Sequence, residues 1–457
     1  MNTPEPSGHV TVIGAGLAGS EAAWQLAARD IPVRLIEMRP HRSTPAHSTD
    51  LFAELVCSNS LKGSDPATAA GLLKLELEAM GSLILSCARA TAVPAGTALA
   101  VDRVAFAGRV TAAVESHPAI TVERAEAAAL PDGDVIIATG PLTSPAMEAV
   151  LTALIGGERL SFFDAAAPVI DAMSIDRTKV FAASRWEKGG SADYLNCPLT
   201  REEYEAFIDA LLAAERVEKR DFETADLFHA CQPVEEVARA GRDAPRYGAL
   251  RPVGLTDPST GRRPWAVVQL RPENASGTAY NLVGFQTNLT FGAQRRVFGM
   301  IPGLADAEFL RFGVMHRNTF VDAPRLLGPS LALRANPRVR LAGQLTGTEG
   351  YLEAAASGLV AAWDVVAARS GGEPVRLPAT TAFGALLAYA SDPDTGPYQP
   401  MHVNFGLFPP LDPPIRRKQE RYAAYGARAR ADLAVMLASR PDLAPVSSDI
   451  PVPARED

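Results

Sequence analysis

The hydrophobic pattern at the N-terminus predicts a strand, a glycine-rich turn, a helix and a second strand. Residues 10–13 form a short apolar run that is typical of a buried strand. Residues 21–29 favour a helix, and residues 33–36 form a second apolar run that ends at an acidic residue. This order of elements opens a Rossmann-type α/β fold.

The turn contains Gly14, Gly16 and Gly19 at the GxGxxG spacing of a dinucleotide-binding loop. Such glycines allow a tight turn, the close approach of a pyrophosphate and close packing of the helix. Unpaired N–H groups at the helix start then favour the anion. Glu37 follows by about 20 residues, where an acid reaches an adenosine ribose hydroxyl. A structural glycine turn and a solvated carboxylate are the alternatives.

Two later segments repeat the pattern of an apolar strand that runs into a glycine turn. One ends at Gly140, and the other, residues 338–363, has Gly343, Gly347 and Gly350 before a long alanine-rich helix. A second glycine-rich helix start suits FAD, which is contacted from both ends of the chain when its domain is interrupted. No second complete GxGxxG appears that would form a separate site for a nicotinamide cofactor. A nicotinamide donor is therefore expected to dock only transiently, against the flavin. The alternative for the later glycines is a packing turn.

We therefore expect an α/β fold with a discontinuous Rossmann-type FAD-binding domain at residues 1–175 and 335–457. An α+β insertion domain for the substrate would occupy residues 176–334. Within it, residues 265–291 predict an antiparallel hairpin, because two apolar runs flank a Gly/Ser/Asn turn. A helix is expected to begin at Thr200 with a capping box.

Length and composition limit the class of protein. The chain has 457 residues, of which 47% are hydrophobic and 21% charged, so two domains are expected. Its start lacks the basic and apolar regions of a secretory signal, and no long uncharged apolar stretch is evident. We expect a cytoplasmic protein without a membrane segment. The net charge of -8 argues against sequence-blind nucleic-acid binding but leaves room for a local basic groove.

Basic residues nevertheless cluster in two segments. Six cationic side chains and two tyrosines lie in residues 416–430. Arginine and tyrosine together are suited to bind phosphates and stack on bases, whereas the alternative is a solvated, salt-bridged surface. The other cluster comprises Arg239, Arg242, Arg246, Arg251, Arg262, Arg263 and Arg271.

The four cysteines form no CxxC pair and no zinc-binding spacing, so we expect reduced thiols and no metal. Cys87 follows an apolar run and Cys197 precedes a proline in a predicted turn, and both are interpreted as structural. Cys57 and Cys231 lie in polar segments, where Lys62 or a helix N-terminus would favour a thiolate. From spacing alone, either is a candidate for catalysis or for an inert side chain.

Long segments of the chain, from about residue 9 to about residue 430, closely resemble the TrmFO family of folate- and FAD-dependent tRNA uracil-5-methyltransferases. That family is related to MnmG, also called GidA. The segments that carry the resemblance are "VCSNSLK", "YLNCPLTREEY", "RYGALRPVGL", "YNLVGFQTNL", "MIPGLADAEFLRFGVMHRNTF", "LAGQLTGTEGYLEAAASGL" and "YQPMHVNFGLFP".

The resemblance implies transfer of a methylene group from methylenetetrahydrofolate to carbon 5 of the T-loop uridine of tRNA, which forms ribothymidine. FAD would be the flavin, reduced by NADPH or NADH. Cys57 and Cys231 match the two catalytic cysteines of the family. Uracil carbon 5 becomes nucleophilic when a thiolate adds to carbon 6. We assign that addition to Cys231 and proton or adduct handling to Cys57, and the reverse order stays open.

Two further positions bear on this resemblance. Tyr351 matches a family tyrosine that is expected to stack on the isoalloxazine or the folate, and its alternative is an ordinary half-buried aromatic residue. Before Cys231 the family often has Phe-Glu-Gly, where this chain has Phe228, His229 and Ala230. The missing carboxylate would change the pKa of the thiol, and His229 is a candidate base or cation in its place.

Three other functions are compatible with the sequence. The same chemistry would serve a uridine of ribosomal RNA, a flavin oxidoreductase would act on a small molecule, and an RNA-binding flavoprotein would be non-catalytic. The oligomeric state stays open, and a monomer is compatible with the sequence.

Overall fold

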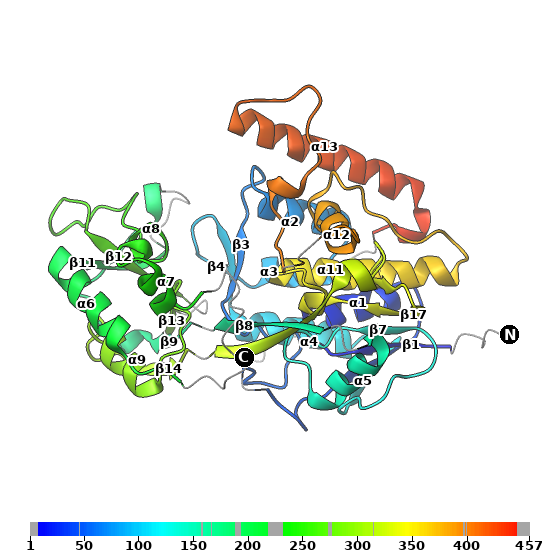
Figure 1. Cartoon of the computed structure of the whole chain (residues 1–457), viewed down its shortest axis with the longest axis horizontal. Coiled ribbons are helices and arrows are strands. Elements are labelled where there is room, and N and C mark those ends of the chain that lie inside the picture. The colour runs from blue at the N-terminus through cyan, green and yellow to red at the C-terminus, as the bar shows by residue number, and fades with distance from the viewer. Residues whose placement is uncertain are drawn as a thin grey trace.

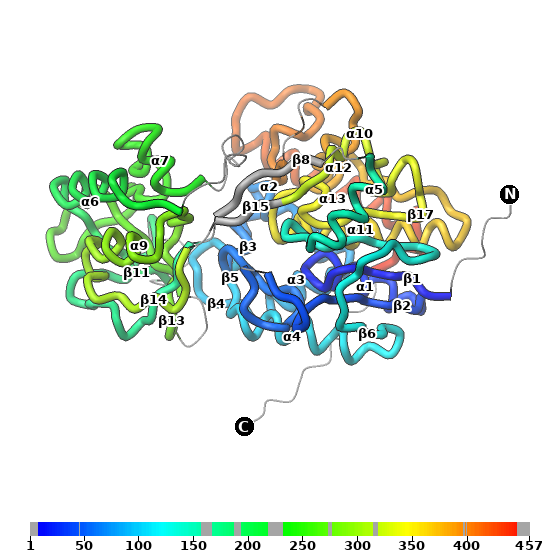
Figure 2. Tube along the Cα trace, turned by 60° about the horizontal axis from the view of Figure 1, so that its bottom comes forward, coloured from blue at the N-terminus to red at the C-terminus, as the bar shows by residue number. Residues whose placement is uncertain are grey.

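The computed structural model contains two groups of elements side by side along its longest axis (Figure 1). The second group, whose elements fall between residues 169 and 311, lies at one end of the molecule in two different views (Figures 1 and 2). For residues 159–165 and 315–318 only the backbone is described. The structure describes residues 8–44, 46–156, 159–165, 167–187, 193–217, 232–272, 277–313, 315–395, 398 and 400–445.

A six-stranded sheet forms the centre of the first group, in the order β16-β17-β7-β1-β2-β6. All neighbours from β17 to β6 are parallel, and β16 is antiparallel. Val12 pairs with Leu35 on one side and Ile136 on the other. The α/β class with a parallel sheet is therefore confirmed. The strands are β1 (Val10–Ile13), β2 (Val33–Glu37), β6 (Ile120–Arg124), β7 (Val135–Ile137), β16 (Ala332–Leu333) and β17 (Asn336–Leu341).

Helices from both ends of the chain surround this sheet and share one hydrophobic core, which we call the first core. Near its centre, Trp363 is fully buried and donates a hydrogen bond from Nε1 to Oε1 of Gln25 (3.2 Å). The helices are α1 (Leu17–Ala27), α2 (Ala69–Ala79), α3 (Leu83–Ala90), α4 (Arg103–Glu115), α5 (Pro145–Ile155), α10 (Ala323–Leu326), α11 (Tyr351–Arg369), α12 (Ala382–Ser391) and α13 (Lys418–Ser439).

Helix α11 is long and apolar enough to span a membrane by length and composition, which the sequence analysis did not anticipate. In the structure, 89% of its most apolar window is buried inside the protein. Asp364 on this helix binds Arg340 of β17 (3.0 Å), and Arg340 also binds Asp134 (2.9 Å). α11 is thus a core helix that is tied to the central sheet.

The second group contains an antiparallel six-stranded sheet in the order β10-β11-β12-β13-β9-β14, with its own hydrophobic core, which we call the second core. The predicted hairpin is confirmed, because β12 pairs with β13. The strands are β9 (Val169–Asp171), β10 (Phe181–Ala182), β11 (Leu195–Leu199), β12 (Ala266–Pro272), β13 (Ala279–Leu282) and β14 (Phe309–Arg311). The helices are α6 (Arg201–Ala213), α7 (Val234–Ala240), α8 (Ala244–Tyr247) and α9 (Phe291–Phe298).

Two local predictions for this group have different outcomes. The capping box at the start of α6 is confirmed, since Thr200 and Glu203 exchange side chain to backbone hydrogen bonds. The predicted turn at Cys197 is wrong, because Cys197 lies within β11. Pro198 is tolerated there because β10 pairs only with Leu195 and Asn196 and leaves that side of the strand open.

Two small sheets complete the fold. β8 (Arg159–Ala165) pairs with β15 (Met315–Val321), and β5 (Ala98–Val101) pairs with β3 (Ser60–Gly63) and β4 (Ala92–Val93). The strands of the second sheet lie between Val169 and Arg311 in the sequence. The domain boundaries at residues 175 and 334 stay a prediction.

A buried carboxylate makes the stability of this fold pH-dependent. Glu76 on α2 accepts hydrogen bonds from the backbone N–H groups of Ala382 (2.6 Å) and Phe383 (3.1 Å) at the start of α12. Burial raises its pKa from 4.5 to about 7, although these two bonds oppose the shift. Between these pH values the unfolded chain has released the proton and the folded chain keeps it. The free energy of unfolding should therefore fall with rising pH, by up to about 3 kcal/mol.

Glu76→Gln should flatten this slope, because its side chain carries no charge at any pH. The measurement is the urea midpoint of unfolding at several pH values from 5 to 8. Glu78→Gln is the matched control on the same helix, since Glu78 is exposed and pairs with Arg89. An unchanged slope in Glu76→Gln would contradict the assignment.

Candidate active site

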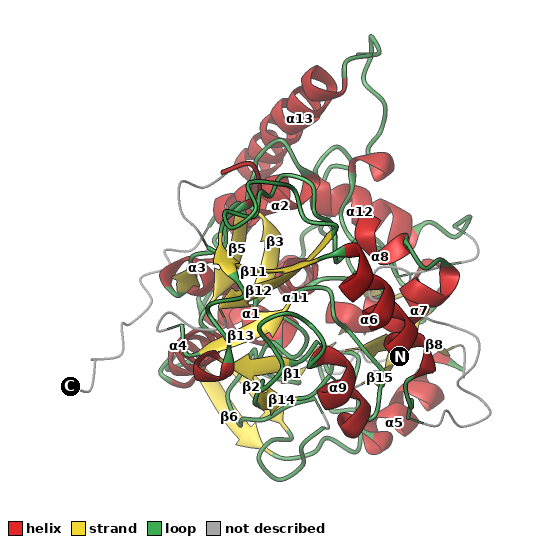
Figure 3. Ribbon diagram, turned by 90° about the vertical axis from the view of Figure 1, so that its left-hand side faces the viewer, coloured by secondary structure: helices red, strands yellow, loops and turns green. Residues whose placement is uncertain are grey.

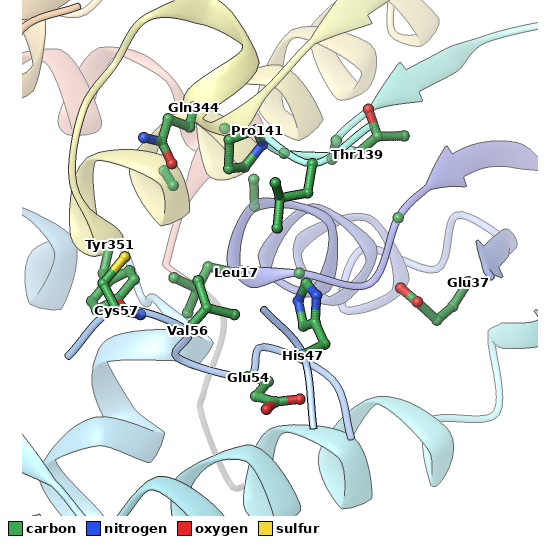
Figure 4. A pocket seen from close by; sticks show the side chains of 18 of the residues that line it. Leu17, Glu37, His47, Glu54, Val56, Cys57, Thr139, Pro141, Gln344 and Tyr351 are labelled. Atoms are coloured by element: carbon green, nitrogen blue, oxygen red, sulfur yellow. The ribbon is translucent and has the colours of Figure 1, made fainter. Parts of the chain in front are cut away.

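A cavity of about 300 Å³ lies where the chain leaves β1, β2, β7 and β17, at the carboxyl ends of the parallel strands. This edge is where ligands bind in open α/β sheets. Its walls come from residues far apart in the sequence, as Figure 4 shows for Glu37, Thr139 and Tyr351. The site is therefore assembled only when both ends of the chain have folded together.

The glycine loop after β1 can be formed only by glycine at two of its positions. Gly14 has φ +96°, and a Cβ there would lie 2.6 Å from the carbonyl oxygen of Ala138. A Cβ at Gly19 would lie 1.7 Å from the carbonyl oxygen of Gly14. A Cβ at Gly16 would meet no protein atom within 4 Å, and Gly16 lines the cavity. Gly16 is also the N-cap of α1 and has no side-chain cap, which leaves the helix N-terminus to a ligand.

Glu37 is buried at the end of β2 and holds this loop in place. Its Oε2 accepts a hydrogen bond from the Ala15 N–H (2.8 Å), and its Oε1 accepts bonds from the backbone N–H (3.0 Å) and Nε (2.9 Å) of Arg39. Burial raises the pKa of this carboxyl, but the charge of Arg39 and the hydrogen bonds outweigh burial and hold the pKa below its ordinary value. Glu37 is therefore ionised at neutral pH.

The N-terminus of α11 enters the same cavity from the other end of the chain. Its N-cap, Gly350, has φ +124° and makes no side-chain cap. Glu353 in its first turn binds the Lys62 ammonium (2.7 Å), and both residues line the cavity. Lys62 is thus paired with a carboxylate at the cavity wall.

Cys57 lies on the cavity wall directly beside Tyr351 (Figure 4). The Tyr351 hydroxyl oxygen accepts hydrogen bonds from the backbone N–H groups of Cys57 (2.9 Å) and Ser58 (3.1 Å). Burial raises the pKa of Tyr351 well above its ordinary value, and electrostatic repulsion from Cys57 adds to the shift. The phenol therefore stays protonated at neutral pH and fixes the backbone that carries the thiol.

Three arginines hold the segment that contains Cys57. Arg103 of α4 donates to the carbonyl oxygen of Leu55. Arg311 of β14 donates to the carbonyl oxygen of Val56 (3.2 Å). Arg271 completes this support from β12.

Arg271 donates from Nε to Oδ1 of Asn59 (2.8 Å) and from Nη2 to the Ser58 hydroxyl (2.9 Å). Asn59 in turn donates to the carbonyl oxygens of Val101 (3.0 Å) and Pro272 (2.8 Å). Since Arg271 and Arg311 belong to the second sheet, the second group positions the thiol of the first.

A buried lysine supports the next turn of the chain. Lys62 adopts a left-handed backbone conformation (φ 64°). Lys74 of α2 donates to the carbonyl oxygens on either side, those of Leu61 (2.7 Å) and Gly63 (2.8 Å). Burial lowers the pKa of Lys74 to about 8, although Glu353 opposes the shift. Lys74 thus holds the strained turn that presents Lys62.

The structure brings most of the predicted site residues together. Gly19 packs on Gly14, and a Cβ at Gly347 would lie 2.4 Å from the hydroxyl of Tyr398, so both act in packing behind the cavity. Cys231, with His229, lies outside the described residues. The predicted residues on the cavity wall are Gly14, Gly16, Glu37, Cys57, Gly140, Gly343, Gly350 and Tyr351.

Several polar residues of the cavity were not predicted. Gln344 donates to Glu349 (2.6 Å), and both line the cavity with Glu353. These three residues lie next to the predicted glycines in the sequence. That proximity is the signal from which they could have been predicted. Gln286 on the wall gave no local signal, and neither did Arg311, which binds the carbonyl of the wall residue Val56, because both come from the second group.

The other cysteines and the arginine cluster have mainly structural roles. Cys87 and Cys197 are fully buried, and burial raises the pKa of Cys87 to about 12, which confirms the structural interpretation. Arg242 pairs with Asp209 (2.6 Å), as the salt-bridged alternative expected. Arg271 is buried against the Cys57 segment, so neither of the two interpretations of the cluster, a phosphate-binding surface or a solvated one, applies to this residue. Among the described residues, no three His, Cys, Asp or Glu side chains are grouped to hold a metal ion.

The glycine loop gives a direct test of the cavity as a dinucleotide site. Gly16→Val should leave the fold intact, because its side chain projects into open space, and should strongly reduce bound flavin per chain. Gly19→Ala should instead lower the thermal midpoint of the protein, because its Cβ collides with the Gly14 carbonyl. Flavin absorbance and thermal melts distinguish the two. Full flavin content in Gly16→Val would mean that the cavity binds no dinucleotide at this helix.

Comparisons with known proteins identify the family of this chain. Residues 9–373 match the family described as Glucose inhibited division protein A. A protein of Moorella thermoacetica named methylenetetrahydrofolate–tRNA-(uracil-5-)-methyltransferase TrmFO is 57% identical over 424 residues, which are 93% of this chain and 97% of the relative. Proteins with the same name from Desulforudis audaxviator (55% identical, 95% of this chain and 99% of the relative) and Geobacter sulfurreducens (54%, 95% and 100%) also match.

A solved structure has the same fold. A crystal structure of Aquifex aeolicus GidA superposes with a TM-score of 0.66 at 16% identity, over 96% of this chain and 77% of that chain. The resemblance seen in the sequence is thereby confirmed. This chain belongs to the TrmFO family and to the wider family of Glucose inhibited division protein A.

Proposed function

We propose that this protein methylates carbon 5 of a uridine in tRNA, the T-loop uridine, with methylenetetrahydrofolate as one-carbon donor and FAD as cofactor. The observation that carries the proposal is the position of Cys57 on the wall of the cavity that the dinucleotide loop also lines. A nucleophilic thiol and a flavin cradle in one cavity suit a reaction that needs covalent activation of a base and a redox step.

The residues of the cavity fit FAD. Gly16 leaves open space at the uncapped N-terminus of α1, which suits the pyrophosphate. Glu37 lies at the end of β2, where it would bind the adenosine ribose. The uncapped N-terminus of α11 would bind the polar edge of the isoalloxazine, beside Tyr351. When bound, FAD supplies the electrons that convert the transferred one-carbon unit into a methyl group.

The two cysteines provide the covalent part of the reaction. A thiolate adds to carbon 6 of the uracil ring, and carbon 5 of the resulting enolate attacks the electrophilic methylene. A second group removes the proton from carbon 5, the bond between the one-carbon unit and its donor breaks with release of tetrahydrofolate, and the thiol then leaves carbon 6. We assign the addition to Cys231 and proton or adduct handling to Cys57.

The remaining parts of the proposal concern the reductant and the domains. We propose NADPH, or NADH, as a reductant that docks transiently. The unit inserted into the FAD-binding domain would comprise the elements from β9 to β14, which share the second core. The cytoplasmic location stays a prediction.

The decisive test is a methyl-transfer assay with the flavin-loaded protein. Unmodified tRNA transcript, NADPH and methylenetetrahydrofolate labelled in the methylene carbon should give label in 5-methyluridine on nucleoside analysis. Cys57→Ala should keep its flavin and lower labelling by about 10²–10⁴-fold, as expected for a group that handles a proton. Cys87→Ala is the matched control, because Cys87 is buried in the first core. No label, with the flavin bound and reducible, would refute tRNA as substrate, and ribosomal RNA would be assayed next.

The order of the two thiols can be tested separately. Uridine that carries fluorine at carbon 5 traps the thiol adduct, because fluorine cannot leave as a proton does. We expect Cys57→Ala to form a covalent complex with 5-fluorouridine tRNA and Cys231→Ala to form none, as measured by a mobility shift under denaturing conditions. A covalent complex in Cys231→Ala would reverse the assignment.

A further inference from the structure

A row of six phenylalanine rings leads from the second core to the protein surface. Its inner rings pack edge-on or tilted, as Phe285 and Phe298 do with a centroid distance of 5.4 Å and an interplanar angle of 78°. Phe298 then contacts Phe309 (6.5 Å) at the sheet edge. The inner end is therefore fixed by the core. The six rings, in order, are Phe207, Phe285, Phe298, Phe309, Phe312 and Phe291.

The outer three rings are stacked in parallel. Phe309 and Phe312 lie 5.0 Å apart at 9°, and Phe312 and Phe291 lie 4.6 Å apart at 15°. Phe291, the last ring, is 52% exposed. Since one of its faces lies on Phe312, the exposed part includes the opposite face. The three stacked rings form an aromatic platform, and the contact with Phe312 orients the outermost ring, Phe291.

Two arginines accompany the platform on α9. The Arg295 guanidinium lies 5.0 Å from the Phe312 ring centroid, and both Arg295 and Arg296 are exposed. Within the described part of the chain neither has a carboxylate at ion-pair distance, whereas Arg242 on the same group does. Their positive charge is therefore available to an anionic partner beside an exposed ring.

The platform stands close to the cavity. Gln286 lines the cavity, and Phe291 follows it by five residues, a span of at most about 17 Å. From the other side, Arg311 binds the carbonyl of Val56 on the cavity wall, and Phe312 is the next residue. Figure 3 looks onto this end of the molecule, where α9 lies toward the viewer.

We propose that the exposed face of Phe291 stacks on an unpaired base of the RNA substrate, while Arg295 and Arg296 bind its neighbouring phosphates. This inference rests on the proposed function, since a uridine must leave its stack before a thiol reaches carbon 6. Every base offers a π-face, so an aromatic platform with cations beside it holds an unstacked nucleotide close to the cavity.

The test measures RNA affinity directly. Phe291→Ala should weaken binding of the flavin-loaded protein to unmodified tRNA transcript by about 10-fold or more. Phe291→Trp should restore it, and its indole fluorescence should be quenched by the transcript but not by a perfect RNA duplex of equal length. Leu310→Ala is the matched control, because Leu310 is equally apolar, is 56% exposed and lies on the adjacent strand β14. Thermal melts and flavin content verify folding.

The arginines give a second measurement. Arg295→Gln should make the slope of log Kd against log salt shallower by about 1, because one phosphate contact is lost. Arg242→Gln, which removes an arginine already paired with Asp209, should leave the slope unchanged.

The outcomes separate this inference from the proposed function. If the wild-type protein methylates tRNA but Phe291→Ala binds it as tightly as wild type does, the platform is not a base-binding site. If Leu310→Ala weakens binding as much as Phe291→Ala, the patch acts by general apolar contact and the inference is wrong. If the wild-type protein binds RNA but transfers no methyl group, the affinity series still decides the inference. Absence of RNA binding would overturn both.

Discussion

The close packing of α1 against α11 is the constraint on which the rest of the structure depends. A Cβ at Gly358 of α11 would lie 2.0 Å from the carbonyl oxygen of Ala18, so only glycine permits this approach. The Ser357 hydroxyl accepts a hydrogen bond from the Gly343 N–H (2.6 Å), which fixes the turn before α11. Because the helices pack so closely, both uncapped N-termini enter one cavity, and a single anionic cofactor can bind both positive helix ends.

The second group contributes to the cavity of the first group as well as carrying the proposed RNA-binding platform. Arg271 and Arg311 come from β12 and β14, and both bind the segment that carries Cys57. A movement of the second sheet would therefore displace the segment that carries the thiol.

Local sequence patterns predicted the elements whose cause is local. The glycine loop, the β12–β13 hairpin and the Thr200 capping box each depend on residues within one turn or hairpin. The support of Cys57 was not predictable in this way, because the Arg271 to Asn59 bond joins residues 212 positions apart. Pro198 misled the prediction for the same reason, since its tolerance depends on where the neighbouring strand β10 ends.

The hydrogen bonds around Cys57 explain how a half-buried cysteine is held for chemistry here. Arg103 and Arg311 donate to the carbonyl oxygens of Leu55 and Val56, and Arg271 donates to the Ser58 hydroxyl. The Tyr351 hydroxyl oxygen accepts from the backbone N–H groups of Cys57 and Ser58. The backbone on both sides of the thiol is therefore fixed by side chains from α4, β12, β14 and α11. A thiol on a fixed backbone needs little reorganisation to meet a bound base, so the packing of the two groups prepares the site before a substrate binds.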